Sequence, residues 1–249
     1  MIVEHLTFKG LKSHLTEQDN LRFKILSDDK LEKYVNTQIL MGAQCKKYIS
    51  DDNKEIYKLT TGNTVEVCTS EGIRANKDKS YTFSFSNESY NTLDISQLDT
   101  SCITTMSYFF DSAKIKDLIL YNLDTQNTLA ITGMFSCFHG NIHGLETLQF
   151  KNCKYFEKLF AYADIKNGID LANLKITSYK CSEQIFDHCS TPFIKIKQLN
   201  TNNTTVFRGV LCKNIEIEKL VLEGIQYDDW INPLNEAHIH VNAQNIVML

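Results

Sequence analysis

An internal repeat is the feature of this sequence that most constrains its fold. The run LDISQLDTSCITTMSYFF begins at Leu93, and runs with the same internal spacing begin at Leu118, Ile169 and Ile194. Each run holds an apolar pair at positions i and i+2, a third apolar residue three positions later, and a bulky pair near its end. The third apolar residues are Leu98, Leu123, Leu174 and Leu199, and the bulky pairs are Phe109/Phe110, Met134/Phe135, Ile185/Phe186 and Val210/Leu211.

Two further stretches extend the pattern. A copy that begins at Leu148 is shorter, with its bulky pair five residues early at Leu159/Phe160, and a sixth start lies at Leu220. The six starts are 25, 30, 21, 25 and 26 residues apart. Repeats of about 20 to 30 residues are typical of solenoids, because each unit can bury its apolar face only against its neighbours.

The apolar pairs predict short strands, because residues i and i+2 of a strand point to the same face. We predict an α/β solenoid that resembles leucine-rich repeats: a parallel β ladder, with the bulky pairs on a return path of short helices or turns. The predicted strands are 93–95, 118–120, 148–150, 169–171, 194–196 and 220–222. The predicted buried residues that follow them are Leu98, Leu123, Cys153, Leu174 and Leu199.

A row of side-chain amides follows the apolar pairs at Gln97, Asn122, Asn152, Asn173 and Gln198. Each carboxamide carries two hydrogen-bond donors and an acceptor oxygen. The row therefore predicts an amide ladder that satisfies backbone groups of adjacent turns. The alternative is that amides are simply frequent in an Asn-rich chain.

The run from Leu93 to Phe110 resembles the BspA-like leucine-rich repeats. Their unit reads approximately Leu-Asp-Leu-Ser, an apolar residue, Asp-Thr-Ser, then Val-Thr-Asn-Met and a Met-Phe pair. The second copy keeps Asp124-Thr125, Met134-Phe135 and Cys137, whereas Lys175 and Asn200 replace the Asp in later copies. The resemblance covers about residues 93–223. It implies a leucine-rich-repeat solenoid that binds a partner, without naming that partner.

The regions on either side of the repeat predict caps. Residues 1–92 contain a helix-compatible stretch that is interrupted near Ser27, a β-hairpin around Gly62, and an alternating strand from Tyr81 to Ser86. We interpret 1–92 as an N-terminal α+β cap, and the alternative is a separate partner-binding domain. Residues 93–225 form the solenoid. Residues 226–249 form a C-terminal cap, in which HIHVNAQNIVML could add closing strands.

Charge and cysteine content indicate the compartment. The net charge is −4, so bulk attraction to nucleic acid or to an anionic membrane is not expected. The N-terminal run MIVEHLTFKGLKSHL lacks the apolar core of a signal peptide. The eight cysteines are consistent with a reducing compartment, where they would be buried free thiols rather than disulfides. These features predict a cytoplasmic protein.

Candidate catalytic and metal-binding residues are few. His139 and His143 lie in an insertion with two glycines, which favours a loop, and His238 and His240 have no third ligand nearby in the sequence. Cys181, His188 and Cys189 also lack the paired spacing of zinc modules. No phosphate-binding loop or nucleophile elbow is present in the sequence. We therefore predict a non-catalytic protein without metal or cofactor.

The residues that alternate with the buried strand positions predict a binding surface. Ile119 and Tyr121 would form an apolar, aromatic spot, and Lys151, Lys195 and Lys197 a basic one. We predict a protein-binding module, by analogy with the small inhibitors with which bacteriophages and mobile elements occlude host defence proteins. The alternatives are a nucleic-acid-binding solenoid that uses the three lysines with Tyr121, and a surface adhesin without its export signal.

Overall fold

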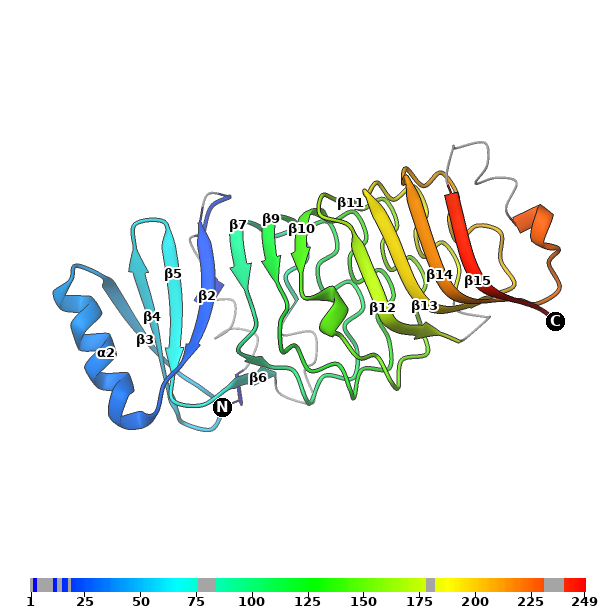
Figure 1. The fold of residues 1–249 in the computed structure, drawn as a ribbon. Helices are drawn as coiled ribbons and strands as arrows, with labels where there is room; N and C mark the ends of the chain where they lie inside the picture. Colours follow the sequence, from blue (N-terminus) through cyan, green and yellow to red (C-terminus); the bar gives the residue numbers. More distant parts are fainter. Residues whose placement is uncertain are drawn as a thin grey trace.

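The chain folds as an elongated β-solenoid, in which most strands stand side by side along the length of the molecule (Figure 1). The N-terminal sheet lies at one end and β15 at the other. This computed structural model describes residues 2–3, 11–12, 15–17, 19–75, 84–177, 182–230 and 240–249.

We call each turn of the solenoid a coil. One row of paired residues connects six successive coils: Ser89, Lys114, His139, Asp164, Ser190 and Leu211. The first four are 25 residues apart, and every pairing in the row is parallel. The strands along this row are β7 (Ser89–Asp94), β9 (Lys114–Ile119), β10 (His139–His143) and the short β11 (Asp164–Ile165). The parallel pairing along this row confirms the predicted parallel ladder.

Longer strands complete the solenoid toward the C-terminus. They are β12 (Ile169–Ile176), β13 (Phe193–Thr201), β14 (Asn214–Leu222) and β15 (His240–Met248), paired in that order and all parallel. The predicted strands 169–171, 194–196 and 220–222 lie within β12, β13 and β14. The prediction that the C-terminal stretch adds a closing strand is also confirmed, by β15.

Two predictions along the ladder were wrong. Residues 148–150 are not a strand. The strand of this solenoid turn is β10, which begins nine residues earlier at His139, and the 3-10 helix η2 (Leu145–Thr147) follows it. The expectation that His139 and His143 lie in a loop is also wrong, because both residues and Gly140 belong to β10. A Cβ at Gly140 would lie 1.7 Å from the carbonyl oxygen of Ile115, so glycine is required here because two strands approach closely.

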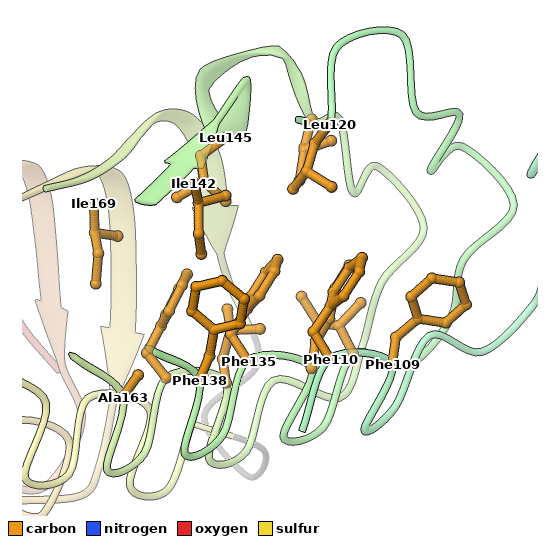
Figure 2. Close-up of a cluster of buried hydrophobic side chains, with 14 of the residues drawn as sticks. Phe109, Phe110, Leu120, Phe135, Phe138, Ile142, Leu145, Ala163 and Ile169 are labelled. Atoms are coloured by element: carbon orange, nitrogen blue, oxygen red, sulfur yellow. The ribbon is translucent and has the colours of Figure 1, made fainter. Parts of the chain in front are cut away.

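A column of stacked phenylalanine rings runs through the core, and two of its members, Phe110 and Phe135, are seen among the buried side chains in Figure 2. It runs through Phe85, Phe110, Phe135, Phe160, Phe186 and Phe207. Successive ring centroids are 5.8, 5.4, 5.2, 5.6 and 5.1 Å apart, and each pair of rings is within 11° of parallel. Offset stacking of this kind adds to the stabilisation from burial alone.

The column corrects the predicted register of two copies. Leu159/Phe160 is in step with Met134/Phe135, 25 residues earlier, so this copy is not shortened on its return path. In the copy that starts at Ile194, Val206/Phe207 rather than Val210/Leu211 is the buried pair, and Leu211 is 68 % exposed. That copy is the shortened one, because Phe207 follows Phe186 by only 21 residues.

The return path consists of turns whose backbone N–H groups donate to the next coil. Phe110 donates to Met134, Phe135 to Leu159 and Phe160 to Ile185, at 2.7–2.9 Å. Two positions take the left-handed conformation on each of four successive return paths, and one of these rows is Ser112, Cys137, Tyr162 and His188. Of the two predicted alternatives, short helices or turns, the return path therefore consists of turns that bond coil to coil.

The residues predicted to follow the strands behave mostly as expected. Leu98, Leu123, Leu174 and Leu199 are buried, and Cys153 is half-buried. Of the predicted amide ladder, Asn152 and Asn173 donate to carbonyls of the preceding coil, at 2.6 and 2.7 Å. Gln97 instead accepts from Ile25, Gln198 bonds within its own strand to Asn200, and Asn122 takes a left-handed backbone conformation. The predicted amide ladder is therefore confirmed only in part.

The N-terminal region continues the same sheet. Strand β2 (Asn20–Ile25) pairs in parallel with β7 on one side and with β5 (Thr64–Thr69) on the other. The sheet then ends with β4 (Glu55–Thr61) and β3 (Gln44–Ile49), both antiparallel to their neighbours. Helix α2 (Asp28–Leu40) packs on this end, and a small second sheet joins β1 (Ile2–Val3), β6 (Ile73–Ala75) and β8 (Leu98–Asp99).

This arrangement confirms the predicted hairpin around Gly62, which joins β4 to β5. The helix prediction holds only after Ser27, since residues 20–25 form a strand. Residues 81–83 of the predicted strand lie outside the described residues, and Phe85 begins the phenylalanine column. Within the described part of the chain, no helix combines the length and apolar character needed to cross a membrane.

The column generates a prediction about stability. Phe135→Ala removes a ring that stacks on both Phe110 and Phe160, so it should lower the free energy of unfolding by about 3–5 kcal/mol. Urea unfolding would be followed by circular dichroism and by the fluorescence of Trp230, the only tryptophan. The two midpoints should shift together, since neighbouring coils stabilise each other. Tyr155→Ala, at an exposed ring, is the control, and an equal effect of both changes would contradict the prediction.

Candidate functional site

The predicted apolar spot lies at the end of β9. Ile119 is half-buried and pairs in register with Asp94 and His143 on the neighbouring strands. Tyr121 is exposed, and its ring covers Gly144, where an added Cβ would lie 3.0 Å from the ring. The spot therefore exists, although one of its two members is only partly accessible.

The three predicted lysines do not form one basic spot. Lys195 and Lys197 lie on β13, where their ammonium groups pair with Glu216 and Glu218 of β14. Lys151 lies in an exposed turn after η2, on another coil. Exposed ion pairs add little stability, but they neutralise the charge that a polyanion would need.

Basic side chains gather instead at the start of β9 and β10. Lys114, Lys116, His139 and Lys166 line one shallow depression. His139 and Lys166 both pair with Asp164 in this depression, at 3.0 and 2.5 Å. Acidic neighbours therefore offset part of this charge as well.

His143 takes part in a polar cluster beside the apolar spot. Asn141 Nδ2 donates to Asp117 Oδ1 at 3.0 Å, and His143 Nε2 lies 3.1 Å from the same oxygen. The hydrogen bond with His143 is the main reason that the pKa of Asp117 is lowered from its ordinary value. The cluster fixes the end of β10 next to Ile119.

A second candidate surface lies on the return path of three successive coils. Its members are Tyr162, Asp187, His188 and Arg208, which we name the Tyr162 group. The rings of Tyr162 and His188 stack in parallel, 5.0 Å apart with an angle of 2°. A Cβ at Gly209 would lie 2.7 Å from the imidazole, so the glycine leaves room for the His188 ring on the next coil.

A buried carboxylate holds this group in place. The Asp187 side chain is only 1 % exposed, and both of its oxygens accept from the Arg208 guanidinium, at 2.8 and 2.6 Å. His188 Nδ1 lies 2.8 Å from Asp187 Oδ1. Burial by itself raises the pKa of Asp187, but the hydrogen bonds and charges of Arg208 and His188 outweigh it and lower that pKa.

The Tyr162 group was not predicted from the sequence. Tyr162 and His188 are equivalent positions, each two residues after the second member of a bulky pair. In other coils that position holds Ser112 and Cys137, so only the assigned register reveals that aromatic rings become neighbours. Arg208 follows the bulky pair Val206/Phe207, which the predicted register had placed four residues later.

The histidines and cysteines that could ligate a metal or form disulfides are spread over several coils. No group of three His, Cys, Asp or Glu side chains suited to a metal occurs among the residues that the structure describes. Cys181 and His238 lie outside those residues. The remaining seven cysteines are free, as predicted, but Cys45 and Cys137 are exposed, which corrects the expectation that all are buried.

One comparison with known proteins gave a match. A family described as "Mycoplasma protein of unknown function, DUF285" matches residues 78–197, which are 120 of the 249 residues. This region is compatible with the resemblance to BspA-like repeats, although the family's description assigns no function. Neither the curated proteins nor the solved structures gave a match.

The Tyr162 group generates a prediction about pH. Because the pKa of Asp187 is lowered in the fold, its ion pair stabilises the protein above the unfolded pKa of about 3.9 and is lost as the pH falls through the lower folded value. Arg208→Ala removes the two hydrogen bonds from the guanidinium to the Asp187 carboxylate, so it should lower the urea midpoint at pH 7.

Urea unfolding in a series from pH 7 into acid, through the lowered pKa of Asp187, measures this difference. The midpoints of Arg208→Ala and the unaltered protein should converge in acid, where Asp187 is protonated in both. Arg208→Lys keeps the positive charge but cannot make the bidentate contact with Asp187. Its urea midpoint at pH 7 should therefore lie between those of Arg208→Ala and the unaltered protein. A difference that does not depend on pH would show that Arg208 acts through packing alone.

Proposed function

We propose that this protein is a non-catalytic protein-binding module, with the Tyr162 group at the centre of its binding surface. One observation carries the proposal: Tyr162 is 57 % exposed and Arg208 is half exposed, yet both belong to a fixed network. Tyrosine and arginine are the residue types most often found at the energetic centre of protein interfaces.

The fixed geometry supports binding energetically. Ordering a mobile side chain at an interface costs about 0.5–1.5 kcal/mol. In the Tyr162 group the stack on His188 and the two hydrogen bonds to Asp187 already order the rings and the guanidinium. A partner that docks here gains contact area without most of that cost.

The strand face is the second surface within this proposal. Ile119 and Tyr121 supply an aromatic spot beside the Asp117 cluster, as the sequence predicts. The nucleic-acid alternative has less support, because Lys195 and Lys197 pair with glutamates. A protein partner is the better match to both surfaces.

The finer parts of the proposal rest on analogy. We infer a cytoplasmic module that acts by occlusion, in the manner of a phage- or mobile-element-type inhibitor of a host defence protein. We also infer that residues 1–92 act as a cap, and the pairing of β2 with β7 supports this. An adhesin would use the same surfaces toward a ligand outside the cell.

Capture of a partner tests the proposal. The purified protein would be used to isolate binders from a low-GC bacterial lysate, and the partner's Kd would then be measured against variants. Tyr162→Ala should weaken binding by about 2 kcal/mol, or roughly 30-fold, without loss of fold. Tyr155→Ala is the matched control, because its ring is exposed on the return path of the same coil. Equal affinities of both variants would remove the Tyr162 group from the interface.

A second set of variants separates the surfaces and the partner classes. If the strand face forms the interface instead, Tyr121→Ala should weaken the binding free energy by roughly 2 kcal/mol or more. A combined Lys195→Ala and Lys197→Ala change should leave a protein partner's affinity and salt dependence nearly unchanged, since both lysines are already paired. A weaker affinity with a flatter salt dependence would favour nucleic acid.

A further inference from the structure

The C-terminal end of the ladder exposes apolar side chains. Strand β15 is the last strand of the row (Figure 1), and among the described residues it pairs only with β14. Ile246, Val247, Met248 and Leu249 follow one another at its end and are 36–69 % exposed. Large apolar side chains that gather at one place on a surface indicate an interaction site.

The preceding strand shows what buries the equivalent positions. Ile246 and Met248 pair in register with Leu220 and Leu222 of β14, which are 0 % exposed. Leu220 and Leu222 lie between two paired strands, whereas Ile246 and Met248 have a described strand on one side only. In a solenoid each coil buries the apolar face of its neighbour. One more strand beside β15 would therefore bury its apolar side chains.

The aromatic core is covered at the same end of the molecule. Trp230 is 2 % exposed, and its ring meets the Phe207 ring edge-on with 5.7 Å between the centroids. The last ring of the phenylalanine column therefore has a partner within the chain. The exposed apolar edge belongs to the strand side of the last coil.

The β15 edge carries no charge that would repel an incoming strand. Residues 240–249 read HVNAQNIVML, without Lys, Arg, Asp or Glu and without proline. Edge strands that avoid pairing commonly carry lysine or proline. The strand at the other end of the sheet has this feature, since Lys46 and Lys47 lie on β3. The two end strands therefore differ in their capacity to pair with another chain.

We propose that β15 pairs with β15 of a second copy of this chain, antiparallel and across a twofold axis. A twofold interface brings the same surface of both copies together. The β15 edge suits such pairing because it offers apolar side chains to bury at Ile246–Leu249 and brings no like charges together. Each copy covers the edge of the other, so the assembly stops at two chains.

The size of the contact limits its strength. Nine residues at about 3.4 Å each make an edge about 30 Å long. With a width of about 10 Å, the strip covers only a few hundred Å², less than the roughly 800 Å² per partner of a standard interface. We therefore expect a dimer that forms at micromolar concentrations. This inference concerns the end of the ladder and does not depend on the Tyr162 group.

Sedimentation of the full-length chain between about 1 and 300 µM tests the proposal. The mean mass should rise with concentration and level off at the mass of two chains. Amide hydrogen exchange across His240–Met248 should slow over the same concentration range. Exchange across Gln44–Ile49 of β3 should not change, because that strand lies outside the contact.

A charged side chain in the contact should weaken the dimer. Ile246→Lys places an ammonium group of each copy at the buried edge, so it should raise the dimer Kd about tenfold or more. Ile49→Lys is the matched control, because Ile49 is a 48 % exposed isoleucine on the end strand β3, and its Kd should stay unchanged. Circular dichroism and thermal unfolding report the fold of each variant, and Val247→Lys replaces Ile246→Lys if that variant misfolds.

Four results would overturn the proposal. The first is a chain that remains monomeric at about 300 µM. The second is an equal effect of Ile246→Lys and Ile49→Lys on the Kd. The third is growth beyond two chains, which would indicate a head-to-tail contact. The last is slow exchange in β15 at every concentration, which would show that the chain itself covers this edge.

Discussion

Contact between successive coils is the interaction on which the rest of this structure depends. No coil encloses a core of its own, so each phenylalanine of the central column is buried only because the next coil supplies another ring at 5.1–5.8 Å. The ends of the column need other partners. Lys12 Nζ lies 4.7 Å from the Phe85 ring centroid at one end, and Trp230 meets Phe207 edge-on at the other.

The coil-to-coil hydrogen bonds also determine where variable residues can stand. Residues in the left-handed conformation turn the return path so that alternate backbone N–H groups donate to the next coil. The side chains of these left-handed residues form a row along the edge of the solenoid. Ser112, Cys137, Tyr162 and His188 all satisfy this backbone requirement. Because the backbone bonds do not depend on the side chain, the row can carry recognition without weakening the stack.

The continuous sheet connects the repeat to the N-terminal region. Pairing of β2 with β7 covers the first edge of the ladder, which would otherwise expose backbone groups. The sheet then passes through β5 and β4 and, among the described residues, ends at β3. The N-terminal strands therefore extend the sheet of the ladder instead of forming a separate sheet.

The sequence by itself determined the architecture, since side-chain periodicity and a repeat near 25 residues are local properties. It predicted a parallel ladder, buried Leu98-type residues and the hairpin at Gly62, and it located Ile119 and Tyr121 on the strand face. Register across coils is a tertiary property, because it depends on which residues stack in three dimensions. Only the structure could show that Gly140 belongs to a strand pressed against Ile115, and that Phe207 continues the column in place of Leu211. The Tyr162 group follows from that register, since its members come from three coils that the chain brings together only when the rings of the core align.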